Sequence, residues 1–112
     1  MPVKNSIFIG FSWSQGFMIP VELISITSSL RIDWKKDRDG PVLIRSTTGA
    51  GVTRDAGDPT QFAVSFDAGQ TADLTSGRLT GEFVEERNDG SERIIGAQVI
   101  VPVVKPFAEP TP

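Results

Sequence analysis

Three glutamates close together in the sequence are the residues of this chain best suited to chemistry. Glu82, Glu85 and Glu86 could supply the acid and base pair of a glycoside hydrolase. On a strand, Glu82 and Glu86 share one face and Glu85 lies on the opposite face. Arg87 follows directly, and no cleft is evident from the sequence. We therefore favour a solvated outer face for this cluster over a catalytic site.

A second group of carboxylates lies in the sequence DRDG, where Asp37 and Asp39 have the spacing found at the start of a calcium-binding loop. A calcium loop needs several further oxygen ligands and a late glutamate, which do not follow here. The turn-forming residues Gly40 and Pro41 come next and favour a hairpin turn. The sequence therefore predicts a solvated turn and no metal site.

The composition excludes most other chemistry. The 112 residues include no Cys and no His, which removes disulfides, thiolate metal sites and histidine acid–base catalysis. Nothing in the sequence is placed to activate a Ser or Thr as a nucleophile. We predict that the protein is not an enzyme and has no catalytic residues, no cofactor and no metal.

Charge and hydropathy narrow the range of partners. The net charge of −3 and the pI of about 4.8 disfavour binding to nucleic acid. No segment approaches the roughly 20 apolar residues that span a bilayer, so no membrane partner is predicted. The first ten residues lack the pattern of a signal peptide, and synthesis in the cytoplasm is expected.

The elements that would position any site are short strands. Between residues 29 and 36, Leu30, Ile32 and Trp34 alternate with polar residues, which is typical of a half-buried strand. A later Asn-Asp-Gly turn between two strand-like runs predicts a hairpin. We predict an all-β fold, an Ig-like antiparallel β-sandwich of about seven to eight strands. It forms one domain over residues 1–104, followed by an extended Pro-rich tail over residues 105–112.

One short segment interrupts this pattern. The Asp67 carboxylate can accept from exposed amides of a helix start, and Gln70 can return a hydrogen bond to it. Leu74 would anchor the segment in the core, and Gly77 supplies a turn. These residues predict a helical crossover near residues 67–74 that links strands of opposite sheets. An anion site at the helix start is disfavoured because Asp67 already places negative charge there.

Large apolar residues near both ends of the chain form a candidate protein interface. In the segment 7–13, apolar residues occupy both strand faces. This is typical either of a central core strand or of a strand that offers one face to a partner, and the sequence leaves both open. Aromatic residues and Met are enriched in interface cores. The candidate interface residues are Phe8, Phe11, Trp13, Phe17, Met18 and Phe107.

The order of several residues resembles a known family. The crossover residues Gln70, Thr71, Leu74, Gly77 and Arg78 are followed by the turn residues Asp89 and Gly90, and then by Gly96, Val99 and Val101. This combination, over Leu30 to Val104, resembles the Ig-like β-sandwich modules of tailed-bacteriophage virions. It is most similar to the N-terminal modules of siphophage upper-baseplate and tail proteins.

The resemblance implies a non-enzymatic structural protein of a phage virion that mediates protein–protein assembly in the tail tip or baseplate. Other virion proteins and copies of this chain would be its partners, and the virion its location. A head decoration, neck or head–tail connector protein is the alternative position in the particle. A host-glycan-binding module is a further alternative, with Trp13 and Trp34 as stacking platforms. It is less favoured because alternation places Trp34 in the core.

Overall fold

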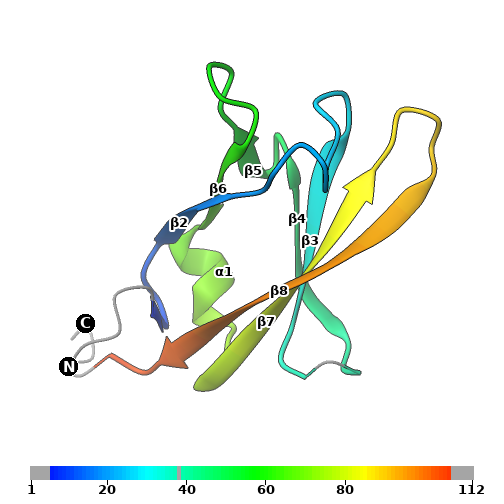
Figure 1. Cartoon of the computed structure of the whole chain (residues 1–112). Coiled ribbons are helices and arrows are strands. Elements are labelled where there is room, and N and C mark those ends of the chain that lie inside the picture. The colour runs from blue at the N-terminus through cyan, green and yellow to red at the C-terminus, as the bar shows by residue number, and fades with distance from the viewer. Residues whose placement is uncertain (1–5, 38, 107–112) are drawn as a thin grey trace.

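Eight strands and one short helix make up most of the computed structural model, which describes residues 6–37 and 39–106 (Figure 1). The helix is α1 (Ala68–Ala72). The strands, in chain order, are β1 (Ile7–Phe8), β2 (Trp13–Met18), β3 (Ser29–Lys35), β4 (Val42–Thr48), β5 (Gly51–Arg54), β6 (Gln61–Phe66), β7 (Gly77–Glu86) and β8 (Glu92–Val104).

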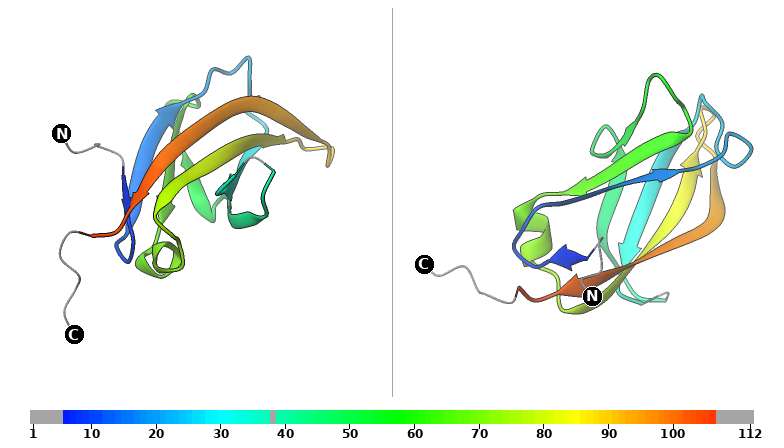
Figure 2. Two further views of the ribbon diagram at one scale, coloured as in Figure 1. Left: turned by 90° about the horizontal axis from the view of Figure 1, so that it is seen from below. Right: turned by 60° about the vertical axis from the view of Figure 1, so that its left-hand side comes forward.

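All of the strands belong to one sheet in the order β1-β8-β7-β3-β4-β5-β6-β2. The sheet curls until it is nearly closed, so that β2, β5 and β6 face β3, β7 and β8 across the core (Figure 2). The predicted all-β sandwich is confirmed. Two short contacts depart from the antiparallel prediction, because β1 pairs with β8, and β4 with β5, in parallel.

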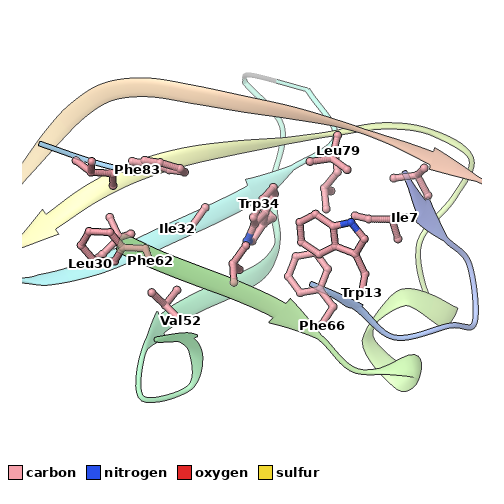
Figure 3. Packing of buried hydrophobic residues seen from close by; sticks show 14 of the residues in the cluster. Ile7, Trp13, Leu30, Ile32, Trp34, Val52, Phe62, Phe66, Leu79 and Phe83 are labelled. Carbon is pink, nitrogen blue, oxygen red and sulfur yellow. The ribbon is translucent and has the colours of Figure 1, made fainter. Parts of the chain in front are cut away.

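The core follows from the period-two alternation of the strands. Leu30, Ile32 and Trp34 on β3 are all buried, as predicted. The Trp34 ring packs edge-on against Phe66 and Trp13, at centroid distances of 5.2 and 6.0 Å (Figure 3). Its indole N–H donates to the hydroxyl oxygen of Ser46 on β4, so the polar atom of this large side chain has a hydrogen-bond partner inside the core.

The N-terminal apolar segment is two strands rather than one. Gly10 has φ of +88°, a conformation that favours glycine, and the chain turns there between β1 and β2. β1 pairs with β8 and β2 pairs with β6, at the two edges of the sheet. The apolar residues on both faces of the segment are explained by this turn, since each short strand buries a different set of side chains.

The helical crossover is confirmed in its details. The Gln70 N–H donates to the Asp67 carboxylate at 2.7 Å, and the Asp67 N–H donates to the Gln70 side-chain oxygen at 2.9 Å. These two bonds form the predicted capping box. Leu74 is buried, and Gly77, with φ of +135°, begins β7. Helix α1 thus carries the chain from β6 to β7, which lie in opposite halves of the curled sheet.

The β7–β8 hairpin turns where the sequence predicted. Gly90 has φ of +88°, and the Asp89 carboxylate accepts from both the N–H and the hydroxyl of Ser91. The strand that follows, β8, is 13 residues long and leaves regular register with β7 between Glu82 and Val84. It is the longest strand among the described residues.

Candidate functional site

The residues proposed from sequence as one interface are not brought together. Trp13 is buried, with its ring 5.1 Å from that of Phe66, and is corrected from an interface residue to a core residue. Phe17 is half-buried and stacks on Phe62 at 5.8 Å. Both side chains point inward because they alternate with the exposed residues of β2.

Three of the remaining candidates are exposed, and two of them share one turn, in which the Phe11 N–H donates to the Phe8 carbonyl at 3.0 Å. Phe8 is on β1 at one edge of the sheet, whereas Met18 ends β2 at the other edge. Phe11 lies in the turn between these strands. Their exposed fractions are 46%, 65% and 46%, respectively. Phe107 lies outside the described residues, so the structure does not place it.

The predicted crossover also fixes the N-terminal turn, a role that the sequence analysis missed. Thr71 of α1 is completely buried. Its hydroxyl accepts from the Gly10 N–H at 3.1 Å and lies 2.8 Å from the Phe11 carbonyl oxygen, to which it can donate. Because one side chain joins segments about 60 residues apart, no local pattern could have indicated this contact.

A row of exposed apolar side chains lies along the outer face of β8. Ile94, Ile100 and Val104 are 65%, 58% and 38% exposed. Phe8 is paired with Val104 and extends the row onto β1. We call these four residues the β8 strip. Between Arg93 and Lys105 the sequence contains no charged residue, which was the available signal for this surface.

The backbone edge beside the β8 strip is also free. β1 covers β8 at Val103 and Val104, where Ile7 and Phe8 pair in parallel. Over the rest of its length, β8 has β7 on one side and no strand of the described residues on the other (Figure 1). An unpaired row of backbone N–H and C=O groups is a template for another strand.

Glu85 is buried, so its predicted position on a solvated face was wrong. Its side chain is buried at the end of the core, opposite Leu30 of β3. It accepts from the Ser25 N–H at 3.0 Å, from Arg93 Nε at 3.0 Å and from Arg87 Nε at 3.2 Å. The Ser25 hydrogen bond and then the two guanidinium groups lower the pKa of Glu85 from 4.5 to about 2, against the opposing effect of burial.

The Glu85 cluster anchors the loop between β2 and β3. Arg93 also donates to the Leu23 carbonyl, and Arg54 donates to the carbonyls of Ser25 and Ser28 at 2.9 and 3.2 Å. An open polar cleft lies over this end of the molecule. The charged groups around the cleft bond to one another and to the loop backbone. We therefore interpret them as structural contacts that hold the loop in place.

Two further carboxylates, those of Glu86 and Asp33, also make ion pairs within the fold. Glu86 accepts from Arg31 on the outer face, where Arg31 and Arg45 also hold Asp33. Glu85 points inward from the same strand, so these glutamates do not converge as a hydrolase pair. The Gly40 N–H donates to the Asp37 carbonyl at 2.9 Å, which is the turn expected of DRDG.

No group of three potential metal-ligating side chains occurs among residues 6–37 and 39–106. In the same part of the chain, no helix has the length and hydropathy needed to cross a membrane.

The glycan-binding alternative relied on two exposed tryptophans. Trp34 is 1% exposed and Trp13 is 8% exposed. Stacking on a sugar needs an accessible ring face, and neither ring offers one. This prediction was wrong because the inward positions of β2 and β3 are core positions in a nearly closed sheet.

The comparisons with known proteins include a distant structural likeness. No protein-family model and no curated protein matches the chain. Among solved structures, it is similar to CopC from Methylosinus trichosporium OB3b, with 16% sequence identity and a TM-score of 0.40. The alignment covers 96% of this chain and 91% of that chain. A likeness at this level does not indicate what the present chain binds.

The predicted role in a phage particle is corrected by this finding. The comparisons return a likeness to CopC and give no support to a role as a virion structural protein, in the tail or in the head. The part of the family resemblance that narrowed it most was the crossover sequence with Gln70, Thr71, Leu74 and Gly77. In the structure these residues make the capping box, the turn contact and the core anchor of a β-sandwich crossover, which general folding requirements explain.

Proposed function

We propose that this chain is a non-enzymatic β-sandwich module that associates with copies of itself. The observation that supports the proposal is the β8 strip, an exposed apolar row on a strand with a free backbone edge. Edge strands of monomeric proteins are commonly protected by charges, bulges or short length. From Ile94 to Val104 this strand has no charge and exposes Ile94, Ile100 and Val104, although it contains Pro102 and a register shift against β7.

The environment of the charged residues supports a non-enzymatic role. A catalytic carboxylate needs an accessible position facing a substrate. The most perturbed carboxylate, Glu85, instead bonds to a backbone N–H and two arginines of its own fold. Its lowered pKa favours the ionised form that these bonds require, and we assign it to stability.

The proposal is tested by the mass of the full chain in solution. Sedimentation velocity over concentrations from about 1 µM to about 1 mM covers the affinities expected of a weak or moderate self-association. We expect the weight-average mass to rise from 12.1 kDa toward about 24 kDa, twice the monomer. A mass that stays at the monomer value across this range contradicts the proposal.

A further inference from the structure

From the contacts of the loop between β2 and β3 we infer that residues 19–28 form a lid that opens as a unit while the sheet stays folded. The loop leaves β2 in one half of the curled sheet and enters β3 in the other half, so it crosses one end of the core (Figure 1). The inference goes beyond the proposed self-association, because it concerns a conformational change at a surface other than the β8 strip.

Two side chains of the lid belong to the core. Ile19 and Ile24 are 4% and 0% exposed, whereas Leu23 and Ile26 are 39% and 63% exposed. No residue of the lid belongs to a strand, so no ladder of backbone hydrogen bonds joins it to the sheet. Segments with little buried apolar surface and no ladder open at a lower free energy than the strands beside them.

The middle of the lid is held by charged side chains of the sheet instead. The Ser25 N–H donates to the Glu85 carboxylate at 3.0 Å, and the Ser25 carbonyl accepts from Arg54 at 2.9 Å. Arg93 donates to the Leu23 carbonyl. Because these contacts lie close together in the sequence, we expect them to break together.

Arg54 is bonded to carbonyl oxygens and not to a carboxylate. Its Nε donates to the Pro59 carbonyl at 2.7 Å, and its terminal nitrogen donates to the carbonyls of Ser25 and Ser28 at 2.9 and 3.2 Å. No carboxylate of the described residues forms an ion pair with it, and burial lowers the pKa of Arg54. A guanidinium without a counter-charge gains hydration when the lid opens, which offsets part of the lost hydrogen bonding.

The lid contains hydrogen bonds of its own. The N–H groups of Leu23 and Ile24 both donate to the Pro20 carbonyl, at 2.9 and 3.3 Å. The Ser28 N–H donates to the Ser25 carbonyl at 3.1 Å. These bonds join residues within the lid, so the lid can move without breaking them. Opening brings water to the buried isoleucines and leaves the pairing of β3 with β4 and β7 in place.

The first test is native-state amide hydrogen exchange of the full chain, measured by NMR in urea below the unfolding transition. The amides of Ile19 and Ser25 report the opening, because their acceptors, on Thr60 and Glu85, lie outside the lid. We expect both amides to have the same protection factor, at least about a hundredfold below those of β3, with little dependence on urea. Protection equal to that of β3, or different protection factors for the two amides, would refute the lid.

A second test compares two conservative substitutions of arginine. Arg54→Lys keeps the charge and removes the forked donor that holds the lid, so exchange at Ser25 should accelerate at least about tenfold. The matched control is Arg45→Lys, because the Arg45 Nε donates to Asp33 at 2.9 Å on the outer face of the sheet. This variant should leave exchange at Ser25 unchanged. Equal exchange at Ser25 in the Arg54→Lys variant and the wild type would overturn the inference.

A third variant separates opening of the lid from unfolding of the sheet. Thr71→Val acts on α1, which follows β6, whereas the lid contacts Thr60 just before β6. It should accelerate exchange in β3 about tenfold, because it destabilises the folded sheet, and should leave exchange at Ser25 unchanged, because the open lid keeps the sheet folded. Circular dichroism confirms that each variant is folded. Acceleration at Ser25 by the same factor as in β3 would show that the loop opens only when the chain unfolds.

Discussion

The buried carboxylate of Glu85 gives the sharpest prediction about stability. Glu85→Gln keeps nearly the same volume and keeps an oxygen that can accept from the Ser25 N–H. It removes the negative charge that faces Arg87 and Arg93 at 3.2 and 3.0 Å. The substitution therefore isolates the ionic part of the cluster from its packing and from its backbone hydrogen bond.

The size of the effect follows from the lowered pKa. A shift of the Glu85 pKa from 4.5 to about 2 corresponds to an upper limit of about 3 kcal/mol in unfolding free energy. The side chains of Arg87 and Arg93 are 48% and 40% exposed, so water screens their interaction with the carboxylate. We therefore expect Glu85→Gln to lower the unfolding free energy by about 1–2 kcal/mol near neutral pH.

The pH dependence has a definite sign. Because the folded-state pKa of Glu85 lies below its unfolded value, its contribution is complete above about pH 4.5 and is lost as the pH falls toward about 2. The difference in unfolding free energy between wild type and Glu85→Gln should shrink over the same window. Urea denaturation followed by tryptophan fluorescence at pH 6, 4, 3 and 2 measures it.

The control is Glu86→Gln, on the adjacent residue of the same strand. Glu86 contacts Arg31 at 3.4 Å from the outer face, and its side chain is 36% exposed. Exposed pairs contribute little, so this change should alter the unfolding free energy by less than about 0.5 kcal/mol. A Glu85→Gln variant as stable as the wild type at pH 6, or a deficit that stays constant to pH 2, would refute the reasoning.

Two further predictions concern packing. Gly81→Ala would place a Cβ 2.9 Å from the Trp34 ring and should lower the unfolding free energy by about 2–3 kcal/mol. In the control Gly16→Ala, the new Cβ meets no atom closer than 3.7 Å, so the unfolding free energy should change by less than about 0.5 kcal/mol. Urea denaturation measures both variants, and equal stability of the two contradicts the packing argument. Thr71→Val removes the buried hydroxyl that holds the N-terminal turn and should lower the unfolding free energy by about 1–3 kcal/mol. Amide hydrogen exchange at Phe11 and its neighbours should become faster. Unchanged exchange there would show that the turn does not depend on this hydroxyl.

The sequence predicts well those structural features whose determining residues lie within a few positions of one another. The inward face of Leu30, Ile32 and Trp34 follows from alternation alone, and the strand buries that face. The capping box of Asp67 and Gln70 spans three residues and forms as predicted. Such features depend on local geometry, which a short stretch of sequence determines.

Features that depend on contacts between distant segments could not be predicted from the sequence. Glu85 is buried because Ser25, 60 residues away, returns a backbone N–H to it, and without that contact the same residue on an alternating strand suggests a solvated position. The contact between Thr71 and Gly10 is equally long-range. The parallel pairing of Ile7 with Val103 joins the two ends of the domain, and no periodicity reports which strands become neighbours.

Two segments, residues 7–13 and β8, have apolar residues on both strand faces, and this pattern alone does not distinguish a core strand from an interface strand. In residues 7–13, the turn at Gly10 divides the apolar residues between two strands, and Trp13 is needed inside the core. β8 continues as one strand through its register shift with β7, and Ile94 and Ile100 lie exposed on it whereas Val101 is buried. Apolar residues on both faces of a run therefore indicate an exposed surface where the chain continues as one strand instead of turning back. By this criterion β8 is the better candidate for an interface, and the N-terminal segment is chiefly a part of the core.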